Sequence, residues 1–176
     1  MKEKRLQYKI AVWLTMGLMI VDPLVVPFAY AANPIEIDTN APHERQATVG
    51  QAGNGITLVN VAGPSAGGVS RNDYTNFNVP QNGVILNNSY QMGNTKLGGY
   101  VPGNPNMMRG SANVIVNEVT SHNPTEMKGF IEVAGRKASV VVANPNGITV
   151  DGGGFINTDR AVLTTGKTEY DSKGNL

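Results

Sequence analysis

The chain has 176 residues and a formal net charge of +1, a size that suits one domain. A charge so close to zero gives no electrostatic footprint for nucleic acid or acidic substrates, so no nucleic-acid partner is expected. The sequence contains no cysteine, which excludes disulfides and thiolate metal sites, and neither a metal nor another cofactor is expected.

The first 31 residues predict a secretory signal peptide. A basic start is followed by an uncharged apolar run, residues 10–21, and residues 29–31 have the small-x-small pattern of a cleavage site. Asp22 interrupts the run before it reaches the roughly 20 residues of a spanning helix, although an uncleaved anchor is the alternative. We therefore expect cleavage between Ala31 and Ala32.

The rest of the chain predicts short β-strands and no helix. Asn and Gly, which disfavour helix interiors, are abundant. Short apolar runs, most of them β-branched, are bracketed by turn-forming residues, as strands require. In chain order, the runs are residues 56–59, 84–86, 114–116, 130–133, 140–142, 148–150 and 161–164.

Two all-β architectures fit these runs, a parallel β-helix and a hairpin-rich sandwich. The runs are very short and the turns are nearly as long, which favours the β-helix. Asn also recurs at the ends of runs, where it tolerates the left-handed conformation of a corner and can hydrogen-bond along the stack. These residues are Asn60, Asn87, Asn88, Asn117 and Asn144. Because the spacing of the runs is irregular, periodicity alone leaves the sandwich open.

Two Asn-Pro-Asn tripeptides occur, at residues 104–106 and 144–146. Asn144, Pro145 and Gly147 fit the first, second and fourth positions of a type I turn, so the second tripeptide predicts a sharp corner between two buried strands. The first tripeptide is followed by Met107 instead of glycine, which predicts a looser turn.

The sequence from Gly103 onward resembles the two-partner secretion domain of filamentous haemagglutinin-like exoproteins, also called the haemagglutination activity domain. The matching stretches include GNPNM, VVVANPNGITV and GGGFINTDRAVLTTG. Met107 replaces the usual Leu of the family, a swap that conserves volume. Some relatives carry a cysteine pair where this chain has Val150 and Gly153. The resemblance covers residues 32–166, between the signal peptide (1–31) and a polar tail (167–176), and the domain looks truncated.

The resemblance implies a right-handed parallel β-helix with an N-terminal capping segment at residues 32–49, which covers the open sheet edge. It implies a non-enzymatic module that is exported through the periplasm and secreted, or retained at the outer surface of a Gram-negative-type bacterium. The implied partner is an outer-membrane β-barrel transporter, whose periplasmic polypeptide-transport-associated domains recognise the unfolded or partly folded chain. The β-helix would then nucleate at the cell surface. The implied recognition residues are Asn104, Pro105, Asn106, Met107, Asn144, Pro145, Asn146, Gly147 and Ile148.

A surface adhesin that binds host or neighbour-cell ligands directly is the alternative function. In either case, roughly five or six coils of about 20 residues would fit between Ile56 and Gly166. The last coil, at Val162 and Leu163, would have only the polar tail to cover its apolar face.

Four patterns could indicate chemistry, and each is better explained as structure. Residues 63–67 match a nucleophile elbow, but no helix follows convincingly. Residues 166–168 lack the earlier glycine of a phosphate loop. Residues 151–154 lack the ligand spacing of a calcium loop and are expected to give the backbone room at a corner. Glu118 and Glu132 are expected on solvated strand faces.

Overall fold

The computed structural model describes residues 34–172, 174 and 176. The predicted signal peptide and its cleavage at Ala31 and Ala32 lie outside the described residues. Strands dominate the described part, with two short 3-10 helices, η1 (His43–Arg45) and η2 (Pro105–Met107). No helix in this part is long and apolar enough to span a membrane.

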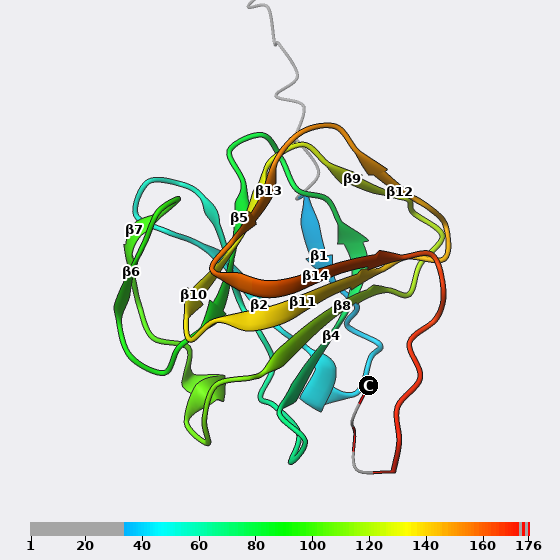
Figure 1. Ribbon diagram of the computed structural model, residues 1–176, viewed down its shortest axis with the longest axis horizontal. Coiled ribbons are helices and arrows are strands. Elements are labelled where there is room, and N and C mark those ends of the chain that lie inside the picture. Colours follow the sequence, from blue (N-terminus) through cyan, green and yellow to red (C-terminus); the bar gives the residue numbers. More distant parts are fainter. Residues whose placement is uncertain (1–33, 173, 175) are drawn as a thin grey trace, which may run out of the picture. The chain divides into compact units, whose positions relative to one another are not determined.

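The strands stack into three walls that the chain visits in turn (Figure 1). The parallel strands of the first wall are β3 (Thr57–Asn60), β5 (Val84–Asn88), β10 (Phe130–Gly135) and β13 (Gly154–Ile156). Those of the second wall are β4 (Val69–Phe77), β8 (Val114–Val119), β11 (Ala138–Ala143) and β14 (Thr158–Thr164). The third wall consists of a bridge at Val79, β9 (Thr125–Met127) and β12 (Ile148–Val150). These parallel neighbours confirm the β-helix, and the sandwich alternative is wrong.

The described chain completes three coils and begins a fourth, so the expectation of five or six coils is wrong. A coil is longer than expected, since Thr57 pairs with Val84 and Ile131 with Phe155. In addition, residues 89–113 leave the stack between β5 and β8. This insertion holds η2 and an antiparallel hairpin of β6 (Gly93–Thr95) and β7 (Gly99–Val101).

The N-terminal end of the stack is covered, which confirms the predicted capping segment. β1 (Ile35–Ile37) pairs antiparallel with β4, and β2 (Thr48–Gln51) pairs antiparallel with β3. Ile35 is fully buried in the main core. The first and second walls therefore end against an antiparallel strand at this end of the stack, which satisfies their backbone edges.

Buried asparagines tie successive coils of the second wall together. The Asn72 Nδ2 donates to the carbonyl of Val116 at 3.0 Å, and the Asn117 Nδ2 donates to that of Val141 at 3.3 Å. The Tyr74 hydroxyl donates to the Asn117 Oδ1 at 3.1 Å. All three polar side chains are buried, and each has partners, as low-dielectric surroundings require.

Glycines allow three coils to approach closely at the corner that leads into the first wall. A Cβ on Gly129 would lie 2.0 Å from the Pro80 carbonyl oxygen, and one on Gly153 would lie 1.9 Å from the Gly129 carbonyl oxygen. Gly153 also has a φ of +79°, which favours glycine. The expectation that residues 151–154 give the backbone room at a corner is confirmed.

The C-terminal end of the stack is open in the described residues. β13 and β14 each pair with one neighbour, and Val162 and Leu163 are 38% and 39% exposed. The tail does not cover this end. It crosses the outer face of the second wall, where Tyr170 packs against Val69, Val116 and Val141 (Figure 1).

Candidate functional site: the two Asn-Pro-Asn turns

The second Asn-Pro-Asn turn forms the corner between β11 and β12, as predicted. The Gly147 N–H closes it by donating to the Asn144 carbonyl at 3.1 Å. Gly147 has a φ of +108°, so glycine is required there, and Ile148 begins the next strand.

The Asn144 side chain joins two coils from a fully buried position. Its Nδ2 donates to the Asn123 carbonyl and to the Thr125 Oγ1, both at 2.9 Å. Its Oδ1 accepts from the Asn146 N–H at 2.9 Å. An asparagine amide has two donor hydrogens and one acceptor oxygen, so each polar atom of this side chain has a hydrogen-bond partner within the domain.

The first Asn-Pro-Asn turn repeats this arrangement at a different corner. Asn104 is also fully buried, and its Nδ2 donates to the carbonyls of Val61 and Asn87, both at 2.8 Å. Its Oδ1 accepts from the Asn106 N–H at 3.0 Å.

The prediction that the first turn is looser is wrong. The Met107 N–H donates to the Asn104 carbonyl at 3.0 Å, so this turn closes like the other. Its chain continues into the 3-10 helix η2, where φ is negative and glycine is not needed. Met107 is 1% exposed and fills the main core, which explains an apolar residue at this position.

Each motif thus has a buried first residue and an exposed surface. Pro105, Asn106, Pro145 and Asn146 are all exposed. The exposed asparagines still bind the preceding coil, since the Asn106 Nδ2 donates to the Val61 carbonyl at 3.2 Å. In the same way, the Asn146 Nδ2 donates to the Ser121 carbonyl at 2.7 Å.

The structure does not join the two motifs into one site. The first turn borders a hollow of about 560 Å³ together with His43, Glu44 and Arg109. The second borders a hollow of about 320 Å³ together with His122 and Lys167. The two hollows have different lining residues.

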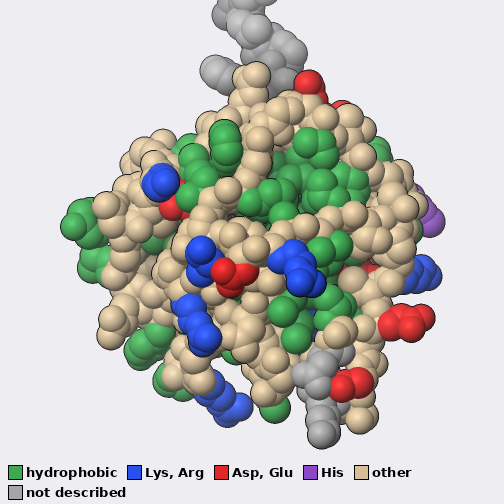
Figure 2. Space-filling model, in the orientation of Figure 1, with side chains coloured by type: hydrophobic (Ala, Val, Ile, Leu, Met, Phe, Trp, Pro, Cys, Tyr) green, Lys and Arg blue, Asp and Glu red, His purple; other side chains and the backbone are tan. Residues whose placement is uncertain are grey.

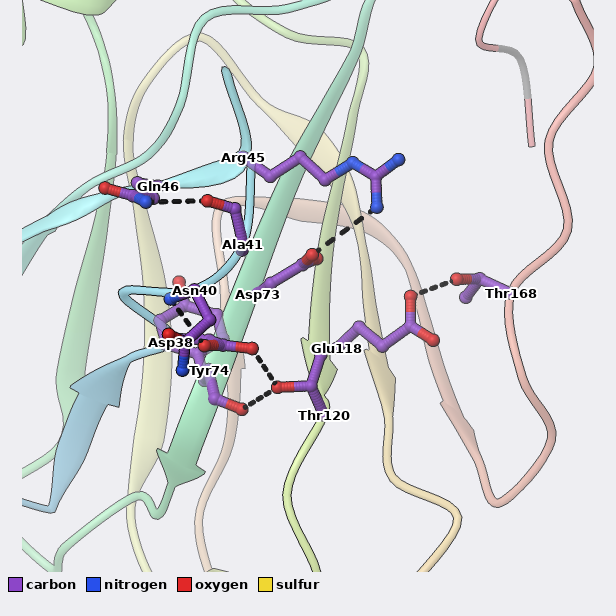
Figure 3. Close-up of polar contacts among 10 residues, drawn as sticks. All are labelled: Asp38, Asn40, Ala41, Arg45, Gln46, Asp73, Tyr74, Glu118, Thr120 and Thr168. Atoms are coloured by element: carbon purple, nitrogen blue, oxygen red, sulfur yellow. Dashed lines mark hydrogen bonds and ion pairs between the residues drawn. The ribbon is translucent and has the colours of Figure 1, made fainter. Parts of the chain in front are cut away.

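A set of polar contacts fastens the capping segment to the second wall (Figure 3). The Arg45 guanidinium lies 3.6 Å from the carboxylate of Asp73, which is 5% exposed. Burial raises the pKa of Asp73, and the Arg45 charge opposes this effect. Thr120 donates from its hydroxyl to Asp38 at 2.7 Å, and this bond, with the Asn40 N–H, lowers the pKa of Asp38.

Glu118 and Glu132 lie on different walls and do not form a carboxylate pair. Glu118 accepts a hydrogen bond from the Thr168 hydroxyl on the outer face of the second wall (Figure 3). Glu132 is 4% exposed, so its expected place on a solvated face is wrong. The hairpin covers it, and its carboxylate accepts from the N–H groups of Lys96 and Leu97, both at 2.7 Å.

The other patterns with possible chemistry are turns. The Ser65 Oγ accepts from the Val69 N–H and donates to the Gly174 carbonyl, both at 3.3 Å, within a turn that precedes β4. In the part of the chain that the structure describes, no three His, Asp or Glu side chains are grouped as metal ligands.

Three walls, an antiparallel cap and two asparagine-locked turns define a capped parallel β-helix of the kind that secretion domains adopt. The chain belongs to the TPS secretion domain family, whose family model matches residues 34–176. The crystal structure of the filamentous hemagglutinin secretion domain superposes with a TM-score of 0.72 at 36% identity, over 80% of this chain and 45% of that one.

Two longer proteins are also similar. Toxin CdiA of Yersinia pestis is 51% identical over 159 residues, which is 90% of this chain and 5% of that protein. The tRNA nuclease CdiA-2 of Burkholderia pseudomallei is 41% identical over 93% of this chain and 5% of that protein. This chain therefore spans about 5% of the length of these curated relatives. The comparisons do not favour the direct-adhesin alternative.

Proposed function

We propose that this domain is the secretion-recognition module of a two-partner secretion exoprotein. The observation that carries the proposal is its membership of the TPS secretion domain family, whose exoproteins are secreted across the outer membrane of Gram-negative bacteria. The partner is an outer-membrane β-barrel transporter with periplasmic polypeptide-transport-associated domains. In this proposal the domain itself is not an enzyme. The relative with the name tRNA nuclease CdiA-2 matches it over only 5% of its own length, which leaves room for the nuclease elsewhere in that protein.

We further propose the order of events along the chain. The signal peptide, residues 1–31, directs export and is cleaved between Ala31 and Ala32. Residues 32–166 are then recognised in the periplasm and fold outside the cell, and the tail, residues 167–176, follows. The exoprotein is released or stays at the outer surface.

Recognition precedes folding in this proposal. Asn104 and Asn144 are fully buried, and their amides are occupied by internal hydrogen bonds. A partner that recognises these side chains must therefore bind the chain before the coils fold. Once the coils have formed, only the Pro-Asn surface of each turn faces solvent, so a folded domain is a poor ligand for the transporter.

Folding then starts at the capped end. Each coil of a solenoid buries its apolar face only against a neighbour, so growth needs one end that is already satisfied. Here β1 and β2 supply that end for the second and first walls. The module thereby acts as a template for coils that leave the transporter after it.

The test separates recognition from folding. Binding to the isolated periplasmic domains of the cognate transporter is measured for the chain diluted from urea and for the folded chain, by fluorescence anisotropy. Asn144→Ile is compared with Asn94→Ile, a matched change on the exposed outer side of the hairpin. We expect the unfolded parent and the Asn94 variant to bind, and the Asn144 variant to bind at least tenfold more weakly. Equal binding by folded and unfolded chains would overturn the proposal.

A secretion assay completes the test. The variants are co-expressed with the transporter, and the secreted fraction is measured. Asn144→Ile and Asn104→Ile should lower secretion, whereas Asn94→Ile should secrete at the parental level. Parental secretion of both motif variants would exclude the turns as recognition residues and leave the family assignment intact.

A further inference from the structure

The insertion carries a group of exposed apolar side chains that the secretion function does not use. Tyr90, Met92 and Tyr100 are 56%, 71% and 75% exposed. We call these three residues the outer hairpin face. Figure 2 shows apolar side chains at the margin of the molecule where Figure 1 draws β6 and β7.

The hairpin is amphipathic, so the exposure of Met92 and Tyr100 follows from its register. Thr95 and Val101 are buried, and Val101 packs in the cluster that contains Ile85. Asn94 pairs with Tyr100, and Met92 lies two residues before Asn94. Because side chains alternate along a strand, Met92 and Tyr100 both face away from the wall.

The outer hairpin face is held rigidly. The carboxylate of Glu132 fixes the hairpin tip through two backbone N–H groups, as described above. The Asn54 Nδ2 also donates to the Leu97 carbonyl at 2.8 Å. Little backbone entropy is therefore lost when the hairpin contacts a surface.

Lysine and arginine residues lie in the insertion and in the turn that stacks on its start. Between Asp73 and Glu118 the chain has no acidic residue, whereas it has Lys96 and Arg109. The Arg136–Lys137 turn of the next coil stacks on the start of the insertion, where the Asn88 Nδ2 donates to the Arg136 carbonyl at 3.0 Å.

The following coil adds one more cation to this corner. Its turn stacks on the previous one, since the Asn157 Nδ2 donates to the Gly135 carbonyl at 3.0 Å, and Arg160 follows shortly after. The exposed acid there, Asp159, lies 3.7 Å from Lys137. We call Lys96, Arg136, Lys137 and Arg160 the basic corner. Figure 2 shows Lys and Arg side chains gathered on this part of the surface.

We propose that the outer hairpin face and the basic corner form a docking surface for an anionic lipid membrane. Tyrosine and methionine on the outermost layer enter the headgroup region, while lysine and arginine meet lipid phosphates. The two hollows described above are lined by other residues, and the outer hairpin face is the outward side of a strand layer. A deformable lipid surface fits such a face better than a partner that must be gripped in a pocket. The surface would hold the folded domain beside the membrane.

The test uses the absence of cysteine from the chain. Met92→Cys and Thr149→Cys, the latter exposed on the third wall, are each labelled in the full chain with a polarity-sensitive fluorophore. Each label reports only its own surroundings, so binding through other parts of the chain does not mimic the signal. The probes are vesicles of phosphatidylcholine, vesicles half composed of phosphatidylglycerol, and polyglutamate.

We expect a blue shift at position 92 with the anionic vesicles alone, no shift at position 149, and loss of the shift in high salt. Lys96→Ser combined with Arg136→Ser should weaken vesicle binding about 30-fold, whereas Lys128→Ser combined with Lys167→Ser should not. An unchanged label at position 92, equal shifts at both positions, or a shift with polyglutamate but not with vesicles would overturn the proposal. The last result would assign the surface to an acidic protein instead.

Discussion

The two ends of this β-helix are built differently. At the N-terminal end, antiparallel strands cover the first and second walls, and Ile35 is fully buried. At the other end, β14 leaves Val162 and Leu163 more than one third exposed, and Figure 2 shows a broad apolar patch among the last strands. The difference gives the solenoid a direction, because new coils can be added at one end only.

The largest expected effect is the loss of core packing at the capped end. Ile35→Ala should lower the free energy of unfolding by about 2–5 kcal/mol, since it leaves a cavity in the main core. Leu163→Ala, the matched change at the open end, should cost about 1 kcal/mol, because that side chain is already 39% exposed. Urea unfolding followed by circular dichroism measures both. Equal losses would mean that the two ends contribute equally.

The loss of a buried asparagine should also have a different effect near each end of the stack. Asn104→Ala leaves the carbonyls of Val61 and Asn87 without this donor. Asn144→Ala does the same to the Asn123 carbonyl and the Thr125 hydroxyl, and each variant should lose about 1–3 kcal/mol of stability. Hydrogen exchange measures how far the destabilisation extends along the chain in each variant. Asn104 lies between the first two coils, so its loss should raise exchange in all walls, whereas loss of Asn144 should raise exchange mainly in β12 to β14. Identical exchange patterns would contradict a directional fold.

The open end should make the domain self-associate. An unpaired strand beside exposed apolar side chains is a template for another chain. Leu163→Lys places a charge on this end and should shift the sedimentation profile toward monomer, while Lys167→Leu should not. A parent that stays strictly monomeric and unfolds sharply at high temperature would show that the end is already protected.

The smallest expected effect is a pH dependence at the capped end. Burial raises the pKa of Asp73, so the folded state binds this proton more tightly than the unfolded state does. Its contribution to stability therefore improves as the pH falls toward the raised pKa. Asp38 has a lowered pKa and behaves in the opposite way, losing its contribution as the pH falls. Asp73→Asn should remove the improvement, which melting curves between neutral and mildly acidic pH would reveal. An unchanged pH profile would exclude Asp73 as its source.

The apolar runs predicted the strands whose side chains are mostly apolar. They did not predict strands whose buried polar side chains need hydrogen-bond partners from other segments. Six of the predicted runs lie entirely in strands of the structure, and the first, residues 56–59, begins one residue before β3. β4 was missed because its sequence, VSRNDYTNF, is largely polar, and its buried Asn72 is satisfied by bonds to the Ala62 N–H and to the Val116 carbonyl of the next coil. The short hairpin strands were also missed, since β6 and β7 contain few apolar residues.

The candidate site was predictable as turns but not as interlocked coils. Turn chemistry predicted the corner at Asn144 from local sequence alone. The bonds from Asn104 to the carbonyls of Val61 and Asn87 join segments far apart in the sequence, and no local pattern specifies them. Glu132 was misjudged for the same reason, because the hairpin that buries it comes from a distant segment.

The glycine corner has a consequence for how such domains vary. Where Pro80, Gly129 and Gly153 stack, even one added methyl group would overlap backbone atoms of the neighbouring coil. Insertions at that corner would separate the coils, so sequence length there is fixed by geometry. The corner after β5 already carries 25 extra residues, 89–113, without disturbing the register of β5 and β10. Foreign peptides or affinity tags should therefore be tolerated at the exposed residues 108–110 of that loop and rejected at the glycines.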